Sequence, residues 1–230
     1  ALPESLSGLL RLEELDLANT PVNDAGAARL AALTKLRGLR LAYTEVGDNG
    51  VKSLAPLQEL RRLDLLSTDI SDASMTAIGA FGNLESLNIS YNKVTSKGLA
   101  PIASLPKLAH LEAARTRLDD EAAPHLARLT SLKQLNLDYT ALSDKGLAVA
   151  QPGLAKLEEF RLDTANLTDA AVDTLAKFPA LRDLNIYHTL ITEAGHAKLQ
   201  KALPQCRIVF DPASALPTRT RWPAACPHRL

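Results

Sequence analysis

The chain has 230 residues, and its 26 Lys and Arg residues balance its 26 Asp and Glu residues, so its formal net charge is zero. This balance argues against nucleic acid as the main partner, because phosphate binding needs a clustered basic surface. It also argues against a polybasic membrane anchor. No apolar run reaches the roughly 18 residues of a membrane-spanning helix, so we expect no membrane insertion. Aromatic residues make up only 4% of the chain, whereas Leu alone supplies 44 residues, which predicts a core of repeated aliphatic packing units.

A motif recurs along almost the whole chain at a spacing of 24 residues. Its first copy places Leu12, Leu15 and Leu17 before Thr20, Val22, Asp24 and Gly26. The eight copies begin at Leu12, Leu36, Leu60, Leu84, Leu108, Leu132, Leu157 and Leu181, and one extra residue enters near 151–153. A fixed period of this length is the sequence signature of a solenoid, in which each unit stacks on its neighbours.

Each copy combines two periodicities. The last two Leu residues of L-x-x-L-x-L are two positions apart, as on one face of a strand, whereas later pairs such as Leu30 and Leu33 have helical spacing. Between them lies a column of residues favoured at helix N-caps, which consists of Asn23, Gly47, Ser71, Thr95, Asp119, Ser143, Thr168 and Thr192. The next column is acidic in seven of eight copies, with Ser96 as the exception, and a negative charge there complements the helix dipole. The unit is therefore predicted to be strand, turn and helix.

These units resemble the leucine-rich repeats of a bacterial 24-residue class that reads T-x-V-T-D-x-G-L-x-x-L. They are also similar to the repeats of F-box substrate receptors, although no F-box segment is present in this sequence. The resemblance implies an α/β leucine-rich repeat solenoid, wound as a right-handed superhelix. It further implies one parallel sheet of about nine strands on the concave side and short helices on the convex side. The family binds many unrelated partners, so the resemblance specifies fold rather than ligand.

The expected domain organisation has two parts. Residues 1–210 form the solenoid, with a partial unit at 1–11, eight units over 12–205 and a terminal strand at 206–210; residues 211–230 form a Pro-rich tail. The partial first unit leaves an open end, which we expect to contact a missing domain or a partner. The tail is interpreted either as a linker or as an ordered cap, with Trp222 docked on the last unit and a possible Cys206–Cys226 bridge.

The candidate site follows from strand alternation. Side chains between the strand Leu positions point away from the core and line the concave side, where neighbouring units lie about 4.8 Å apart. The candidate partner-binding residues on these columns are Arg40, Arg62, Asp64, Asn88, Glu112, Asn136, Asp138, Arg161, Asp163 and Asn185. Beside them lie all four Tyr residues, at Tyr43, Tyr91, Tyr139 and Tyr187, each 48 residues from the next.

The Tyr residues have two possible roles. Tyr combines a large contact area with a polar tip and is enriched at interfaces, so a row of Tyr beside Arg, Asp and Asn favours a binding face. Alternatively, each ring packs against the neighbouring unit where the strand ends. The two roles are compatible.

The common sequence motifs of enzyme and metal sites are absent. The sequence contains no phosphate-binding G-x-x-x-x-G-K-[ST], no H-E-x-x-H and no paired C-x-x-C. The Gly residues recur once per unit and are interpreted as structural, and the acidic column is interpreted as helix capping rather than a calcium ladder. We therefore expect no catalytic residues, no cofactor and no metal.

The predicted function is a non-catalytic protein-interaction scaffold. The alternatives are a specificity domain of a larger enzyme or receptor, or a module that binds carbohydrate or a cell-surface ligand.

Overall fold

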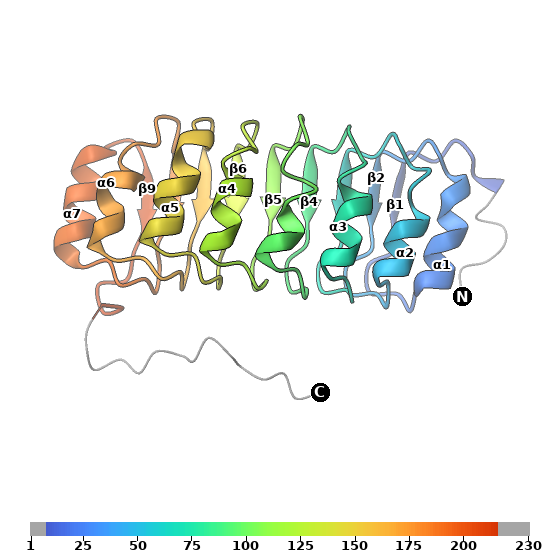
Figure 1. Ribbon diagram of the computed structural model, residues 1–230, viewed down its shortest axis with the longest axis horizontal. Coiled ribbons are helices and arrows are strands. Elements are labelled where there is room, and N and C mark those ends of the chain that lie inside the picture. Colours follow the sequence, from blue (N-terminus) through green and yellow to red (C-terminus); the bar gives the residue numbers. More distant parts are fainter. Residues whose placement is uncertain (1–7, 216–230) are drawn as a thin grey trace.

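The computed structural model describes residues 8–215 and consists of a single row of stacked units (Figure 1). Nine parallel strands form one sheet in sequence order. The strands are β1 (Glu14–Asp16), β2 (Gly38–Arg40), β3 (Arg62–Asp64), β4 (Ser86–Asn88), β5 (His110–Glu112), β6 (Gln134–Asn136), β7 (Glu159–Arg161), β8 (Asp183–Asn185) and β9 (Arg207–Val209). Leu39 pairs with Leu63, and Leu63 pairs with Leu87, so equivalent residues of successive units are neighbours. This confirms the predicted parallel sheet and solenoid.

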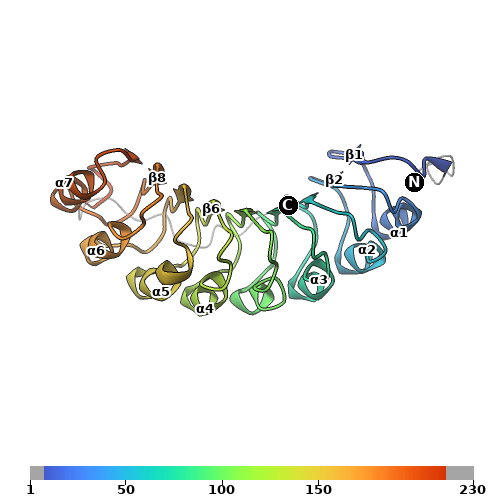
Figure 2. The ribbon, with the colours of Figure 1, turned by 90° about the horizontal axis from the view of Figure 1, so that it is seen from above.

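Short helices cover the other side of the sheet. The α-helices are α1 (Asp24–Arg29), α2 (Asp48–Ser53), α3 (Asp72–Ile78), α4 (Ala123–Leu126), α5 (Asp144–Ala150), α6 (Val172–Leu175) and α7 (Glu193–Ala202). Short 3₁₀ turns complete or replace them at η2 (Leu30–Ala32), η3 (Ser96–Leu99), η4 (Asp120–Ala122), η5 (Gln151–Gly153) and η6 (Asp169–Ala171). Seen from above, the row is an arch with the helices outside and the strands inside, so the sheet lines the concave face (Figure 2). Among the described residues, no helix has the length and apolarity needed to cross a membrane.

The core is a continuous aliphatic layer between the sheet and the helices. The strand residues Leu39, Leu63 and Leu87 are buried, and so are the helix-side residues Leu30 and Leu54. Three large rings, Phe81, Phe160 and Phe178, take Leu-type positions in this layer, and the last two lie with their ring centroids 5.7 Å apart. No unit could enclose its apolar side chains alone, since its upper and lower faces are covered only by the adjacent units.

A ladder of Asp side chains joins the units at the starts of the helices. The aspartate ladder consists of Asp24, Asp48, Asp72, Asp120, Asp144 and Asp169. Each carboxylate accepts a hydrogen bond from the backbone N–H of the N-cap residue in the following unit. For example, the Asp120 oxygens lie 2.7 Å from the Ser143 nitrogen and 2.5 Å from its Oγ. The acidic column therefore does more than complement a helix dipole, because it bonds each unit to the next.

The fourth unit has no acid at this position and makes the same connection with the roles exchanged. Ser96 occupies the ladder position, and its neighbour at the next N-cap is Asp119. The Ser96 hydroxyl donates to Asp119 Oδ1 over 2.6 Å and accepts from the Asp119 N–H over 3.0 Å. A hydroxyl and a carboxylate have exchanged positions, so the junction keeps both hydrogen bonds.

Close packing against the ladder explains the recurrent Gly. A Cβ at Gly50 would lie 2.6 Å from Asp24 Oδ1 and 2.8 Å from Val46 Cγ1, so a larger residue there requires these side chains to shift. In the third unit Ser74 takes the same position, and its hydroxyl donates to Asp48. The expected structural role of this column is thus accounted for by the space that the preceding carboxylate occupies.

The extra residue before the seventh unit is accommodated on the convex side. It lies in η5, where a Cβ at Gly153 would overlap the carbonyl group of Ala127. Strand pairing is undisturbed, since Leu135 still pairs with Phe160.

The structure tests the sequence predictions for the two ends of the chain only in part. β9 falls within the segment expected to form the terminal strand, and the Cys206 thiol beside it is buried. Most of the partial unit at 1–11 lies outside the described residues, as do Trp222 and Cys226.

Candidate functional site

In each of the eight units, the third residue after the strand has a left-handed backbone. The left-handed row consists of Asn19, Tyr43, Ser67, Tyr91, Arg115, Tyr139, Thr164 and His188, with φ between 51° and 63°. None of them is Gly, although a side chain in this region costs roughly 1–2 kcal/mol. Backbone hydrogen bonds to the next unit hold the conformation; for example, Tyr43 N donates to the Leu66 carbonyl over 2.8 Å. The row places its side chains at the edge where the strands end.

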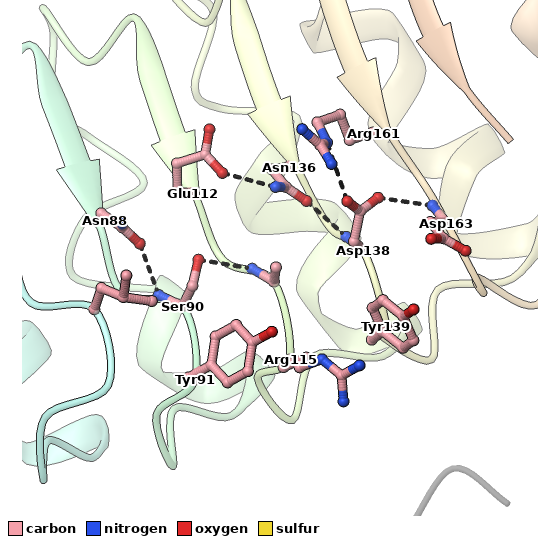
Figure 3. Close-up of a pocket in the computed structure, with 12 residues that line it drawn as sticks. Asn88, Ser90, Tyr91, Glu112, Arg115, Asn136, Asp138, Tyr139, Arg161 and Asp163 are labelled. Atoms are coloured by element: carbon pink, nitrogen blue, oxygen red, sulfur yellow. Dashed lines mark hydrogen bonds and ion pairs between the residues drawn. The ribbon is translucent and has the colours of Figure 1, made fainter. Parts of the chain in front are cut away.

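Two Tyr rings of this row enclose an Arg. The guanidinium carbon of Arg115 lies 3.8 Å from the centroid of the Tyr139 ring and 5.5 Å from that of Tyr91 (Figure 3). Tyr91 is 48% exposed and Tyr139 is 40% exposed, so the stack lies at the surface. Cation–π contacts of this kind fix the side chains without removing them from solvent.

The stack borders a pocket of about 320 Å³ on the concave face, the central pocket. Its lining comes from units three to seven and consists of Leu66, Asn88, Ser90, Tyr91, Glu112, Ala114, Arg115, Asn136, Asp138, Tyr139, Arg161 and Asp163. In Figure 3 the polar side chains point toward one another from adjacent strands, with the Tyr–Arg–Tyr stack along one side. Eight of the fourteen predicted partner-binding residues line this pocket: Asn88, Tyr91, Glu112, Asn136, Asp138, Tyr139, Arg161 and Asp163.

Several predicted residues also hold the backbone. Asp64, Asn88, Asn136 and Asn185 each accept a hydrogen bond from the backbone N–H two residues further on, over 2.9 to 3.1 Å. This bond fixes the turn that leads into the left-handed row. The recurrence of Asp or Asn at this position is therefore a sequence signal for the turn as well as for a polar concave face.

Other predicted residues lie away from the pocket. Arg40 bridges Asp16 and Asp64, with its nitrogens 3.3 and 3.0 Å from their carboxylates, and Arg62 pairs with Glu14 over 2.5 Å. Tyr43 is 53% exposed and stands two units from Tyr91. Tyr187 lies one position before the left-handed row, half-buried, with its ring centroid 4.0 Å from that of His188.

Burial perturbs the acids of the central pocket. Desolvation raises the pKa of Asp138, although it accepts hydrogen bonds from Asp163 N over 2.7 Å and from Arg161 Nε over 3.0 Å. Desolvation also raises the pKa of Glu112, whose Oε2 accepts from Asn136 Nδ2 over 2.7 Å. Burial alone would lower the pKa of Arg161, but the charge and hydrogen bond of Asp138, together with the charges of Glu112 and Glu159, outweigh burial, and that pKa is raised.

Arg115 was not among the predicted site residues. Arg115 occupies in the fifth unit the position that Tyr91 occupies in the fourth and Tyr139 in the sixth, so the 24-residue spacing alone places it between them. What the spacing does not give is the ring-over-cation contact, which depends on side-chain rotamers. Among residues 8–215 no group of three or more His, Cys, Asp or Glu side chains is arranged to hold a metal ion.

These features define the class of protein. The chain is characterised as a leucine-rich repeat solenoid by its nine in-register strands, a left-handed turn after each of the first eight, and a polar concave face. The family profile described as a leucine-rich repeat region matches residues 1–217, so the chain belongs to the leucine-rich repeat family.

Solved structures with this fold include two bacterial proteins. An internalin, inlF, from Listeria monocytogenes is 22% identical with a TM-score of 0.67, and the match covers 91% of this chain and 64% of that protein. Internalin C2 of Listeria monocytogenes is also 22% identical, with a TM-score of 0.70 and coverage of 92% and 85%. The plant peptide hormone receptor RGFR1, solved in complex with RGF2, is 18% identical with a TM-score of 0.59 over 91% of this chain and 34% of the receptor. The chain thus spans less than two thirds of inlF and about a third of the receptor. No curated protein matches it significantly in sequence.

Proposed function

We propose that this protein is a non-catalytic interaction scaffold that binds a protein partner on its concave face, with the Tyr residues of the left-handed row as anchors. Leucine-rich repeat solenoids offer extended concave surfaces whose curvature is set by the stacking of units. A preorganised surface of this kind lowers the entropy cost of association. The hydrogen-bonded register of the sheet supplies that rigidity here, since every strand pair is in register.

One observation carries the proposal. Tyr43, Tyr91 and Tyr139 stand in the left-handed region with 40–53% of their surface exposed. Packing alone gives no reason for this choice, because Gly or Asn would suit the backbone better and the rings remain half in solvent. A contact surface does give a reason, since Tyr offers large area at low conformational entropy. A plant receptor of the same fold was solved with a peptide hormone, which supports a protein or peptide as the partner.

The test uses the double variant Tyr91→Ala, Tyr139→Ala. A partner is first captured with wild-type protein from the source organism and purified, and its affinity for each variant is then measured by calorimetry. We expect the double variant to weaken binding at least a hundredfold, because two central aromatic anchors are lost. The control is Val149→Ala, which removes an exposed apolar side chain from helix α5 on the convex side and should leave affinity unchanged.

Thermal unfolding distinguishes a binding role of the Tyr residues from the alternative, in which each ring only packs against the neighbouring unit. The anchors make few buried contacts, so the double variant should unfold within a few degrees of wild type. Unchanged affinity in the double variant, or equal loss in the Val149→Ala control, would contradict binding through the Tyr row.

A further inference from the structure

Glu112, like Glu159, is an acid of the concave face that takes part in no ion pair among the described residues. Most other acids of this face are paired with Arg, in the pairs Asp16–Arg40, Asp64–Arg40, Glu14–Arg62, Asp138–Arg161 and Asp183–Arg207. Within the described part of the chain, Glu112 takes part in no ion pair and its carboxylate is bonded only to the amide of Asn136. It is nonetheless half-buried in the central pocket, where an unpaired charge is costly.

The charges around Glu112 leave an excess of negative charge. The central pocket contains the carboxylates of Glu112, Asp138 and Asp163 against the guanidinium groups of Arg115 and Arg161. Arg161 Nε is already bonded to Asp138, and Arg115 is held at the rim by the two Tyr rings. The charge of Arg161 reaches Glu112 without forming an ion pair with it, and the carboxylates of Glu159 and Asp138 act on Glu112 in the opposite direction. A cation that entered here would therefore meet complementary charge.

The shape of the pocket suits a long side chain with a charged end. Its volume of about 320 Å³ is at the lower end of small-molecule pockets, so it holds a side chain rather than a folded element. Leu66 and Ala114 supply apolar surface for an aliphatic stem, and Lys and Arg bury such stems while their heads reach a polar group. The exposed Tyr91 ring can contribute a cation–π contact.

We propose that the central pocket binds a Lys or Arg side chain from an extended segment of the partner protein, with its charged head against the Glu112 carboxylate and its stem along Leu66 and Ala114. This rests on the proposed function and names the chemistry that the concave face selects. The half-buried carboxylate is kept without an internal ion pair because the partner supplies the cation.

Short peptides test the pocket without a known partner. The probes are acetyl-Ser-Lys-Ser-amide, its Arg counterpart, and its norleucine counterpart, which keeps the aliphatic stem and lacks the charge; putrescine serves as a free diamine. Each is titrated into ¹⁵N-labelled protein, and chemical shifts are followed by NMR. The side-chain amide of Asn136 is the local reporter, since it donates to Glu112.

Two variants make the result specific. Glu112→Gln keeps the shape and an acceptor for Asn136 but removes the charge, whereas Glu121→Gln removes an exposed carboxylate from η4 on the convex side. The Lys and Arg probes should shift the Asn136 amide, bind about tenfold more weakly to Glu112→Gln, and bind Glu121→Gln as they bind wild type. A dispersed spectrum of Glu112→Gln excludes unfolding as the cause.

Three results would overturn the proposal. The first is a shift of the Asn136 amide with the norleucine probe as large as that with the Lys and Arg probes. The second is undiminished binding of the Lys and Arg probes to Glu112→Gln. The third is tighter binding of putrescine than of the peptides, which would assign the pocket to a soluble diamine. The proposed function fails separately, in the Tyr variants. A partner that depends on Tyr91 and Tyr139 but binds Glu112→Gln with unchanged affinity would leave the scaffold function standing and refute the basic side chain.

Discussion

Substitution Asp120→Ala tests whether the aspartate ladder holds the units together. The Asp120 carboxylate accepts from Ser143 N over 2.7 Å and from Ser143 Oγ over 2.5 Å, and both groups are partly buried. Hydrogen bonds to a charged group contribute about 1.5–3 kcal/mol each. Water can reach part of this junction in the variant, so we expect a loss of about 2–4 kcal/mol in the free energy of unfolding rather than the full sum.

The matched control is Asp69→Ala, which removes the same atoms from a solvent-exposed site. Asp69 pairs with Lys93 over 2.5 Å, and their side chains are 69% and 63% exposed. A surface ion pair of this kind contributes about 0.5 kcal/mol or less. Both variants are to be compared by urea unfolding, monitored by circular dichroism.

The ladder also predicts how unfolding changes. Because Asp120 lies at the junction between the fifth and sixth units, its loss should uncouple the two halves of the solenoid and broaden the transition. The ladder does not stabilise the stack as described if Asp120→Ala and Asp69→Ala lower the free energy of unfolding by amounts that agree to within about 0.5 kcal/mol, the rough limit of measurement.

Two further predictions concern the concave face. The free energy of unfolding of Tyr43→Gly should be about 1 kcal/mol higher than that of Tyr43→Ala, because both variants lose the ring but only Gly relieves the left-handed backbone at φ 57°. Equal stability of the two variants in urea unfolding would count against backbone strain at this position. Glu112→Gln should be more stable than wild type at pH 7, because burial raises the pKa of Glu112 in the folded state and so penalises the ionised form. That advantage is expected to shrink as pH falls through the raised pKa and to vanish below 4.5, the ordinary pKa of a Glu side chain. A difference in the free energy of unfolding between Glu112→Gln and wild type that stays constant from pH 7 to pH 4 would refute this prediction.

The repeat spacing was enough to predict the sheet. Because equivalent positions recur every 24 residues, Leu39, Leu63 and Leu87 had to be neighbours once the strands were parallel. The N-cap column was equally predictable, since Asn, Asp, Ser and Thr have few other reasons to recur before a helix. Six of those eight residues accept a hydrogen bond from a helix N–H through their side chains.

The bonds between units were not predicted, although the sequence contained a signal for them. The exchange of residue types at Ser96 and Asp119 is explained only if the two positions touch. Neither column taken alone indicates that coupling. The left-handed row contains no Gly, and its conformation is imposed by backbone bonds to the next unit, so the sequence signalled it only through the recurrent Asp or Asn that fixes the preceding turn. The central pocket likewise depends on rotamers of side chains from five units, which the period does not specify.

The exchanged pair at Ser96 and Asp119 limits how such an array can change length during evolution. Loss of the fourth unit alone, residues 84–107, would set Asp72 against Asp119 and bring two carboxylates together. Loss of the fourth and fifth units as a block, residues 84–131, would instead join Asp72 to Ser143 and restore an ordinary junction. It would also bring Tyr43 and Tyr139, which now lie four units apart, to the two-unit spacing of neighbouring Tyr residues. The fourth and fifth units are therefore retained or lost only together, because each carries one half of the exchanged pair.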